Sequence, residues 1–306
     1  MIGKIVKVYG KFYIVLNNDE RINCVLRGKI RKDERLKRFS EPAATGDMVD
    51  FDLNDDGTGA INSIQQRKNV FSRKDKARGK EDIIASNLDQ IVIIQSFTKP
   101  KLNLRFVDRL LVRGMKENIP VVLCVNKVDL ATKENIDYVH QYYNGISLKV
   151  LIVSAKSGKG LKKLKKTLSG KLSIFVGYSG VGKTSVLNEI YPGLELPTSP
   201  ISESTGKGKH TTTNVELIDV GENTSIMDTP GVREFGLFDI EPHLLGIYFN
   251  DFTEYIGNCR FSPCTHDHEP KCGVKDEVEK GNIFHDRYVS YLNILHSLQE
   301  AHDNLY

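Results

Sequence analysis

Short segments that alternate apolar and polar residues occupy the N-terminal part of the chain, a pattern that predicts half-buried β-strands. Five such segments span residues 2–8, 12–16, 22–26, 49–53 and 61–64. Five strands are typical of an OB-fold, a Greek-key barrel that commonly binds oligonucleotides, and an SH3-like barrel fits the same spacing. We therefore predict an RNA-binding OB-type barrel over residues 1–68. Residues 69–86 are polar and basic, and they predict a linker or an arm that orders on a partner.

From residue 87 the pattern changes to apolar runs that alternate with helical periodicity. Strands are predicted at 90–95, 121–125, 150–153, 172–176, 215–220 and 225–227, and helices near 104–117, 135–143 and 185–190. Repeated βαβ units of this kind predict a mostly parallel α/β sheet over residues 87–240, with its ligand bound where the strands end. Residues 241–306 predict a smaller, helical domain.

A glycine-rich turn joins the predicted strand 172–176 to the predicted helix at 185–190. It reads Gly177-Tyr178-Ser179-Gly180-Val181-Gly182-Lys183-Thr184, and Ser185 follows it. This is the P-loop pattern: its N–H groups would surround the phosphates, Lys183 would reach the outer phosphates, and the Thr184 hydroxyl would ligate Mg²⁺. A purely structural turn is disfavoured because strand, turn and helix occur in the required order.

Two other predicted strand ends carry candidate base-binding residues. These residues are Asn126, Lys127 and Asp129 after one strand, and Ser154, Ala155 and Lys156 after the next. The Asp129 carboxylate can accept both N1–H and N2–H of guanine, whereas adenine offers neither donor, so the base would be guanine. For either motif alone, an ordinary turn at the end of a strand is the alternative.

The candidate switch residues lie farther along the chain. Asp228 and Gly231, in a D-T-P-G motif, would reach Mg²⁺ through water and the γ-phosphate through an N–H group, while Thr212 would ligate Mg²⁺ directly. Val232 stands where many GTPases have a glutamine that orients the attacking water, which predicts slow intrinsic hydrolysis. His210 is the candidate replacement, and an exposed loop histidine without a catalytic role is its alternative.

The order of these motifs is reversed relative to ordinary GTPases, in which the P-loop precedes the guanine-binding residues. With Asn126 and Ser154 placed before Gly177, the chain resembles, over essentially its whole length, the RsgA/YjeQ/YloQ family of ribosome small-subunit-dependent GTPases. The resemblance implies an OB-fold, a circularly permuted GTPase domain and a zinc-binding domain. It also implies GTP hydrolysis in late maturation of the small ribosomal subunit, stimulated by the subunit and coupled to release, with catalytic roles for His210, Thr212 and Lys183.

A cluster of cysteine and histidine residues in the C-terminal part reproduces the zinc pattern of that family. The predicted ligands are Cys259, Cys264, His266 and Cys272. Three thiolates and one imidazole would form a closed, structural zinc site. His268 is a competing imidazole, and a disulfide with a spare thiol is the alternative to a metal. Cys24 and Cys124 fall at apolar strand positions and predict core residues.

The formal net charge of +4 conceals two opposite halves. Residues 215–306 contain 6 Lys and Arg against 17 Asp and Glu, whereas residues 1–214 contain 37 against 22. The basic residues concentrate at 27–38, 67–80 and 156–171, which favours a polyanionic partner such as rRNA over three merely solvated faces.

Lys4 and Lys7 interrupt the first apolar residues, so the sequence predicts neither a signal peptide nor a membrane-spanning segment. Five cysteines are an odd number at low density, which indicates a reducing compartment. We therefore expect a cytoplasmic monomer whose partners are GTP or GDP and the small ribosomal subunit. Two other functions fit the motifs: a passive nucleotide sensor bound to RNA, and a small-molecule P-loop kinase, which Asp129 disfavours.

Overall fold

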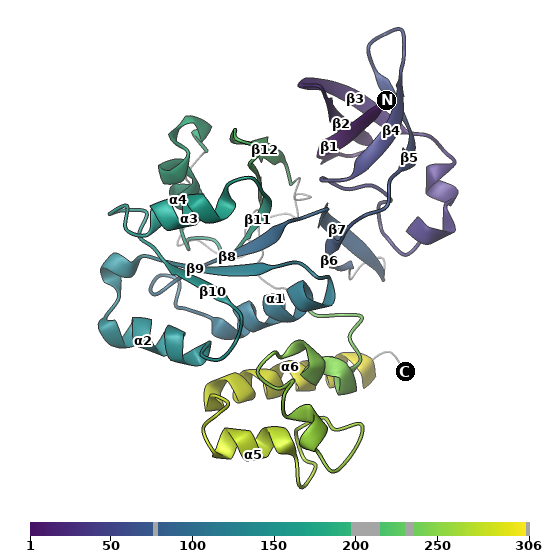
Figure 1. Ribbon diagram of the computed structural model, residues 1–306. Helices are drawn as coiled ribbons and strands as arrows, with labels where there is room; N and C mark the ends of the chain where they lie inside the picture. Colours follow the sequence, from purple (N-terminus) through teal and green to yellow (C-terminus); the bar gives the residue numbers. More distant parts are fainter. Residues whose placement is uncertain (76–78, 197–214, 230–235, 304–306) are drawn as a thin grey trace, which may run out of the picture.

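The N-terminal strands close into a five-stranded barrel in the computed structural model, which describes residues 1–75, 79–196, 215–229 and 236–303 (Figure 1). The strands are β1 (Ile2–Tyr9), β2 (Phe12–Asn17), β3 (Glu20–Leu26), β4 (Met48–Leu53) and β5 (Gly59–Ile64). They pair in the order β1-β2-β3-β5-β4, with β4 returning to β1 and β3 parallel to β5. This is the OB-type order, so the OB prediction is confirmed over the SH3-like alternative.

The segment predicted as a flexible linker forms an antiparallel hairpin instead, made of β6 (Val70–Asp75) and β7 (Lys80–Ser86). Phe71 and Ala85 pair across the two strands, and both side chains are fully buried in the core of the next domain. Ile84 also packs against that core, but the polar residues of the hairpin hide these contacts from a reading of the sequence.

A six-stranded sheet forms the centre of the molecule, in the order β10-β9-β8-β11-β13-β12. Its strands are β8 (Gln90–Ser96), β9 (Val121–Asn126), β10 (Lys149–Ile152), β11 (Leu172–Val176), β12 (Leu217–Asp219) and β13 (Ser225–Asp228). The pairings are parallel except for the edge strand β12, which confirms the predicted mostly parallel sheet.

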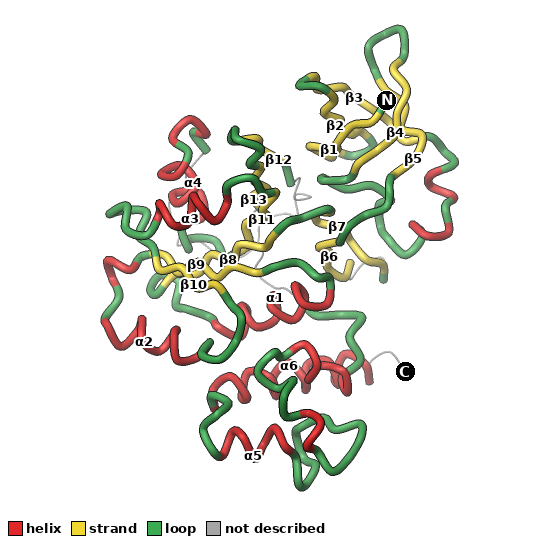
Figure 2. Tube along the Cα trace, in the orientation of Figure 1, coloured by secondary structure: helices red, strands yellow, loops and turns green. Residues whose placement is uncertain are grey.

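Helices cover both faces of this sheet. They are α1 (Leu104–Lys116) and α2 (Lys133–Tyr142) on one face, and α3 (Leu161–Leu168) and α4 (Lys183–Ile190) on the other (Figure 2). Alternate residues of each central strand therefore contribute to two separate cores, as Ile91 and Val92 of β8 do. Helix α3 was not predicted, although Leu161, Leu164 and Leu168 give it a buried face between its lysines.

The C-terminal part contains α5 (Gly273–Glu279) and α6 (His285–Asp303), and it packs beneath α1 (Figure 1). Short 3-10 helices complete the chain at Ile30–Lys32, Glu34–Leu36, Val128–Leu130, Pro192–Leu194, Pro242–Tyr248 and Ile256–Asn258. Within the described ranges, no helix combines the length and the apolar character needed to cross a bilayer.

Candidate nucleotide site and metal centre

The predicted nucleotide motifs meet at one edge of the central sheet. Parallel strands end at a common edge, so β9, β10 and β11 deliver Asn126, Ser154 and Gly177 to neighbouring positions. Asp228, the last residue of β13, reaches the same edge. The reversed order of the motifs in the sequence is therefore compatible with one composite site.

Asn126 joins the P-loop to both guanine-side loops. Its side chain is 2 % exposed. It donates a hydrogen bond from Nδ2 to the Val181 carbonyl oxygen at 3.0 Å, and its Oδ1 accepts one from the Ala155 N–H at 3.1 Å. One side chain thus fixes three loops that are separated along the chain.

Close backbone approach explains two of the P-loop glycines. A Cβ atom on Gly182 would lie 2.4 Å from Nδ2 of Asn126, and Gly182 has a φ of +92°, which favours glycine. A Cβ atom on Gly177 would lie 2.3 Å from the Ile94 carbonyl oxygen of β8. Both glycines are needed because the turn is pressed against neighbouring strands.

Lys183 is buried at the start of α4 and points back into the P-loop. Its Nζ donates hydrogen bonds to the carbonyl oxygens of Gly177 at 2.8 Å and Tyr178 at 3.3 Å. Burial lowers the pKa of Lys183, and the negative charge of Asp228 opposes that shift. The ammonium group is thus held close to where the P-loop pattern requires phosphate oxygens.

Asp129 stands at the open side of the site and is oriented by its neighbours. The Ser154 hydroxyl donates a 2.6 Å hydrogen bond to Oδ1 of Asp129, and this bond lowers the pKa of the carboxyl group. Lys127 has a left-handed backbone with φ of 64°, and its Nζ donates to the Gly180 carbonyl oxygen at 2.7 Å. The carboxylate is therefore ionised at neutral pH and available to a ligand's N–H groups.

A cavity of about 530 Å³ opens between these loops. It is lined by Asn126, Lys127, Asp129, Leu130, Ala155, Lys156, Gly182, Ser185, Asn188 and Glu189. The volume falls in the range of small-molecule sites, and the predicted base-binding residues and the end of the P-loop line the same space. Asp129 and Gly182 therefore line one cavity.

Asn188 and Glu189 are lining residues that the sequence motifs did not indicate. Asn188 also exchanges two hydrogen bonds with the backbone of Leu196, at 3.0 and 3.1 Å. Asn188 and Glu189 lie one helical turn beyond the P-loop on α4, and no motif includes them. The only signal in the sequence is that Asn188 falls four residues, about one turn, after Thr184.

Asp228 has the features expected of a residue that serves a divalent cation. Its Oδ1 is buried and has no hydrogen-bond partner within the described part of the chain. Burial raises the pKa of Asp228, and the charge of Lys183 partly reverses that shift. A carboxylate oxygen left unsatisfied beside the P-loop fits a cation or its bound water, so the residues present suit Mg²⁺. The predicted residues His210, Thr212 and Gly231, and also Val232, lie outside the described residues.

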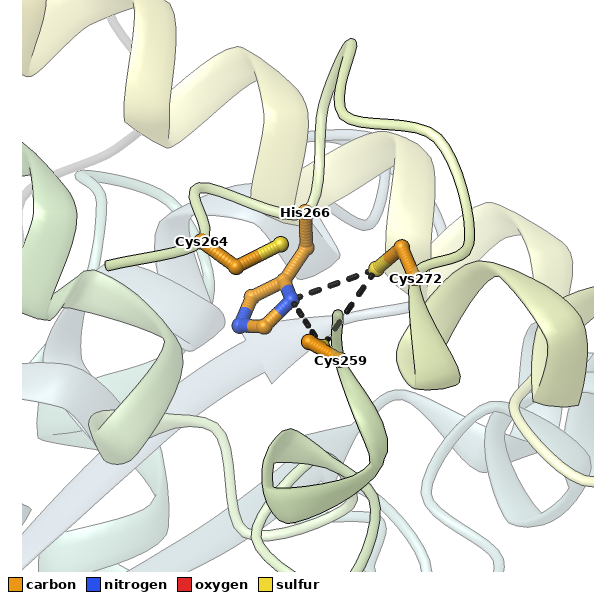
Figure 3. A group of neighbouring side chains, drawn as sticks. All are labelled: Cys259, Cys264, His266 and Cys272. Carbon is orange, nitrogen blue, oxygen red and sulfur yellow. Dashed lines mark hydrogen bonds between the residues drawn. The ribbon is translucent and has the colours of Figure 1, made fainter. Parts of the chain in front are cut away.

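Four potential metal ligands converge in the C-terminal part (Figure 3). They are the side chains of Cys259, Cys264, His266 and Cys272, whose ligand atoms all lie within 4.8 Å of one another. Nδ1 of His266 lies 3.3 Å from Sγ of Cys272 and 3.5 Å from Sγ of Cys259, and those two sulfur atoms are 3.8 Å apart.

These separations lie within about 0.2 Å of the edges of a tetrahedron around zinc, which are about 3.5–3.8 Å for Zn–S bonds of about 2.3 Å and Zn–N bonds of about 2.0 Å. They are far longer than a disulfide bond of about 2.0 Å, and the cysteines are free thiols. The competing His268 is exposed and lies outside the cluster. The cluster therefore fits a closed Cys₃His metal site.

The surrounding residues hold His266 in place. A Cβ atom on Gly246 would lie 2.9 Å from Nε2 of His266, so glycine permits the helix Pro242–Tyr248 to approach the ring. The hydroxyl of Tyr288 donates a hydrogen bond to the His266 carbonyl oxygen at 2.8 Å. The hydroxyl of Tyr291 donates one to the carbonyl oxygen of the neighbouring Thr265 at 2.6 Å. The tyrosines of α6 thus anchor the ligand loop.

An OB-type barrel, a P-loop and guanine-side loops in reversed order, and a Cys₃His cluster together define a circularly permuted GTPase. The model of the RsgA GTPase family matches residues 64–238, and that of the RsgA N-terminal domain matches residues 2–61. The chain belongs to the RsgA GTPase family.

Similar proteins match along nearly the whole chain. The small ribosomal subunit biogenesis GTPase RsgA 2 of Bacteroides thetaiotaomicron is 39 % identical, with 98 % of each chain covered. The RsgA protein of Flavobacterium johnsoniae is 37 % identical over 98 % of this chain and 94 % of its own length. Among solved structures, YjeQ from Thermotoga maritima superposes with a TM-score of 0.78 at 33 % identity, covering 97 % of this chain and 98 % of its own. YloQ, described as a circularly permuted GTPase, superposes with a TM-score of 0.73 at 30 % identity, covering 98 % and 95 %.

Proposed function

We propose that the chain hydrolyses GTP while bound to the small ribosomal subunit, late in the biogenesis of that particle, and that the subunit stimulates the reaction. The observation that carries this proposal is the contact of Asn126 with both Val181 and Ala155, because it unites the phosphate and guanine loops in one site. The names of the relatives supply the ribosomal context.

In the proposed complex, Asp129 accepts the N1–H and N2–H groups of guanine, and the P-loop N–H groups surround the phosphates. Lys183 exchanges its present backbone acceptors for phosphate oxygens. When bound, Mg²⁺ would neutralise phosphate charge, and Thr184 and Asp228 would hold it together with Thr212. We assign the orientation of the attacking water to His210.

We also assign Cys259, Cys264, His266 and Cys272 as ligands of one structural zinc ion. Support comes from the spacing of their ligand atoms and from their enclosure in the core of the C-terminal domain. With four protein ligands, no position is left for a substrate, so the ion would stabilise the fold and take no part in hydrolysis.

The proposed rRNA partner is supported by the distribution of cationic side chains. On α3, Lys162, Lys163, Lys165 and Lys166 are all exposed, and none of them forms an ion pair within the described residues. In the run at 27–38, by contrast, most charges are paired within the chain, as in the contact of Arg35 with Asp33 at 2.7 Å. The charge of α3 is thus available to phosphates. We further propose a cytoplasmic monomer.

GTP turnover measured with and without purified small ribosomal subunits, at two salt concentrations, tests the proposal. Small subunits should accelerate turnover, large subunits should not, and the higher salt concentration should weaken the effect. His210→Ala should remove most of the stimulated rate while GTP still binds. Preferential hydrolysis of ATP, or no stimulation at either salt concentration, would contradict the proposal.

The coupling of hydrolysis to release has its own test. The GTP-analogue form should bind small subunits more tightly than the GDP form, measured by sedimentation with the two forms at equal concentration. Equal affinities would rule out the coupling while leaving the hydrolytic activity unaffected.

A further inference from the structure

The outer face of β2 carries apolar side chains that folding explains only in part. Phe12, Ile14 and Leu16 alternate with the inward residues of this strand. Ile14 and Leu16 pack against the core of the GTPase domain, which accounts for them. Phe12 lies at the far end of the strand and is 50 % exposed, so packing within the described chain does not require an aromatic residue there.

Phe12 belongs to a small preformed aromatic surface. The ring of Tyr9 stacks beside it, with centroids 5.6 Å apart and planes inclined by 24°. The hydroxyl of Tyr9 donates a 2.7 Å hydrogen bond to Oδ1 of Asn23 on β3, which fixes the orientation of the ring. Val25 lies directly opposite Phe12 and is also exposed. We call the surface formed by Tyr9, Phe12 and Val25 the aromatic platform.

One unpaired positive charge and one ion pair lie beside the aromatic platform. Lys11 lies in the turn between β1 and β2, next to Phe12, and is exposed without an ion pair among the described residues. Arg27 follows directly after β3, and its half-exposed guanidinium is paired with Asp52 at 2.9 Å, so its charge is already balanced. An exposed aromatic ring beside the unpaired Lys11 complements a nucleotide, whose base is flat and whose phosphate is anionic.

We propose that the aromatic platform stacks an unpaired base of RNA and that Lys11 contacts the adjoining phosphate. The inference rests on the proposed function, because it specifies which part of an RNA partner the barrel takes. Bases inside a duplex have both faces covered by their neighbours, so only a single-stranded or extruded base can stack on Phe12. The second and third strands of OB-folds and the loop between the first two are also where oligonucleotides bind in other proteins.

The chain contains no tryptophan, which permits a direct test. Phe12→Trp introduces a single indole on the aromatic platform, and a single-stranded RNA 12-mer should quench its fluorescence. The same RNA annealed to its complement should not. By anisotropy at fixed salt, Phe12→Ala should bind the single strand about 5- to 100-fold more weakly, and Phe12→Trp should retain the affinity.

Two further variants separate stacking from other contacts. Phe12→Leu keeps an apolar side chain but lacks a π-face, so its affinity should fall nearly as far as that of Phe12→Ala. Lys11→Ala should reduce the dependence of affinity on salt by about one released counterion. Leu53→Ala is the matched control: Leu53 is 51 % exposed on the same barrel, in line with the inward residues of β4, and its loss should have no effect.

Full affinity in Phe12→Ala, full affinity in Phe12→Leu, or quenching by the duplex would each overturn the proposal. Retention in Phe12→Leu would point instead to an apolar contact with a protein. Phe12 is not among the residues that line the nucleotide cavity, so basal GTP turnover should be unchanged in every variant. Failure of subunit-stimulated turnover in the unmodified protein would contradict the proposed function alone, since the RNA 12-mer reports on the aromatic platform without the subunit.

Discussion

Replacement of Asn126 by alanine should uncouple the phosphate loop from the guanine-side loops. The variant loses the hydrogen bonds to Val181 and from Ala155, and leaves a carbonyl oxygen and an N–H group without their partner inside the protein. Each such loss costs about 1–2 kcal/mol, so the total should be about 2–4 kcal/mol. This free energy should appear partly as a loss of folding stability and partly as a loss of nucleotide affinity. If all of it appeared in binding, the affinity would fall by about 30- to 1000-fold.

Denaturant unfolding of the nucleotide-free protein and calorimetric titration with GDP measure the two parts. Asn126→Asp is the matched variant, because it keeps an acceptor for the Ala155 N–H and loses only the donor to Val181. It should therefore preserve the Ala155 loop but place a carboxylate against a carbonyl oxygen. If Asn126→Ala changes neither the free energy of unfolding nor the GDP affinity beyond about twofold, the loops are positioned independently and the reasoning fails.

Three further predictions concern the other parts of the chain. Cys264→Ser should lower both the zinc content and the thermal midpoint, while His268→Ala, which alters an imidazole outside the cluster, should change neither. Arg287→Met should reduce the free energy of unfolding by about 3–5 kcal/mol because Asp108 stays buried without its cation, and adding Asp108→Leu should restore part of it. Burial alone would raise the pKa of Glu216, but the hydrogen bonds and charges of Lys7 and Arg21 in the barrel lower it. Ionised Glu216 should therefore add at most about 1 kcal/mol to the free energy of unfolding, because the pair is so exposed. In denaturant unfolding at several pH values, this stabilisation should be complete above the ordinary glutamate pKa and disappear as the pH falls through the lowered value. Glu216→Gln should lack it at every pH.

The strands could be predicted where their burial gives the sequence a simple hydrophobic pattern. Barrel strands alternate because one face is buried, and the central strands are uniformly apolar because both faces are covered. The hairpin and α3 were missed because their buried residues are few and separated by charges. Phe71, Ala85 and the partly buried Ile84 anchor the hairpin, and the leucines of α3 stand between pairs of lysines, so the charges mask the helical spacing.

The nucleotide residues could be predicted because phosphate and guanine recognition constrain the sequence locally. Their mutual arrangement could not, since it depends on strand order. The motif predicts that Asn126 follows a strand, but its contact with Val181 requires β8 to lie between β9 and β11. The contribution of Asn188 depends in the same way on how α4 faces the cavity.

The packing of the C-terminal domain limits how hydrolysis can be transmitted to it. The family resemblance implies that hydrolysis is coupled to release, and in the sequence the C-terminal domain follows shortly after the D-T-P-G motif. However, Arg113 of α1, itself fully buried, holds Asp239 at 3.0 Å, and Arg287 of α6 contacts Asp108 of α1 at 2.6 Å. Breaking the Arg287–Asp108 pair, which is buried on both sides, costs about 3–5 kcal/mol, so a movement that separates the domain from α1 is strongly unfavourable. A shift transmitted from the nucleotide should therefore carry α1 and the C-terminal domain together, with the change concentrated between α1 and the sheet.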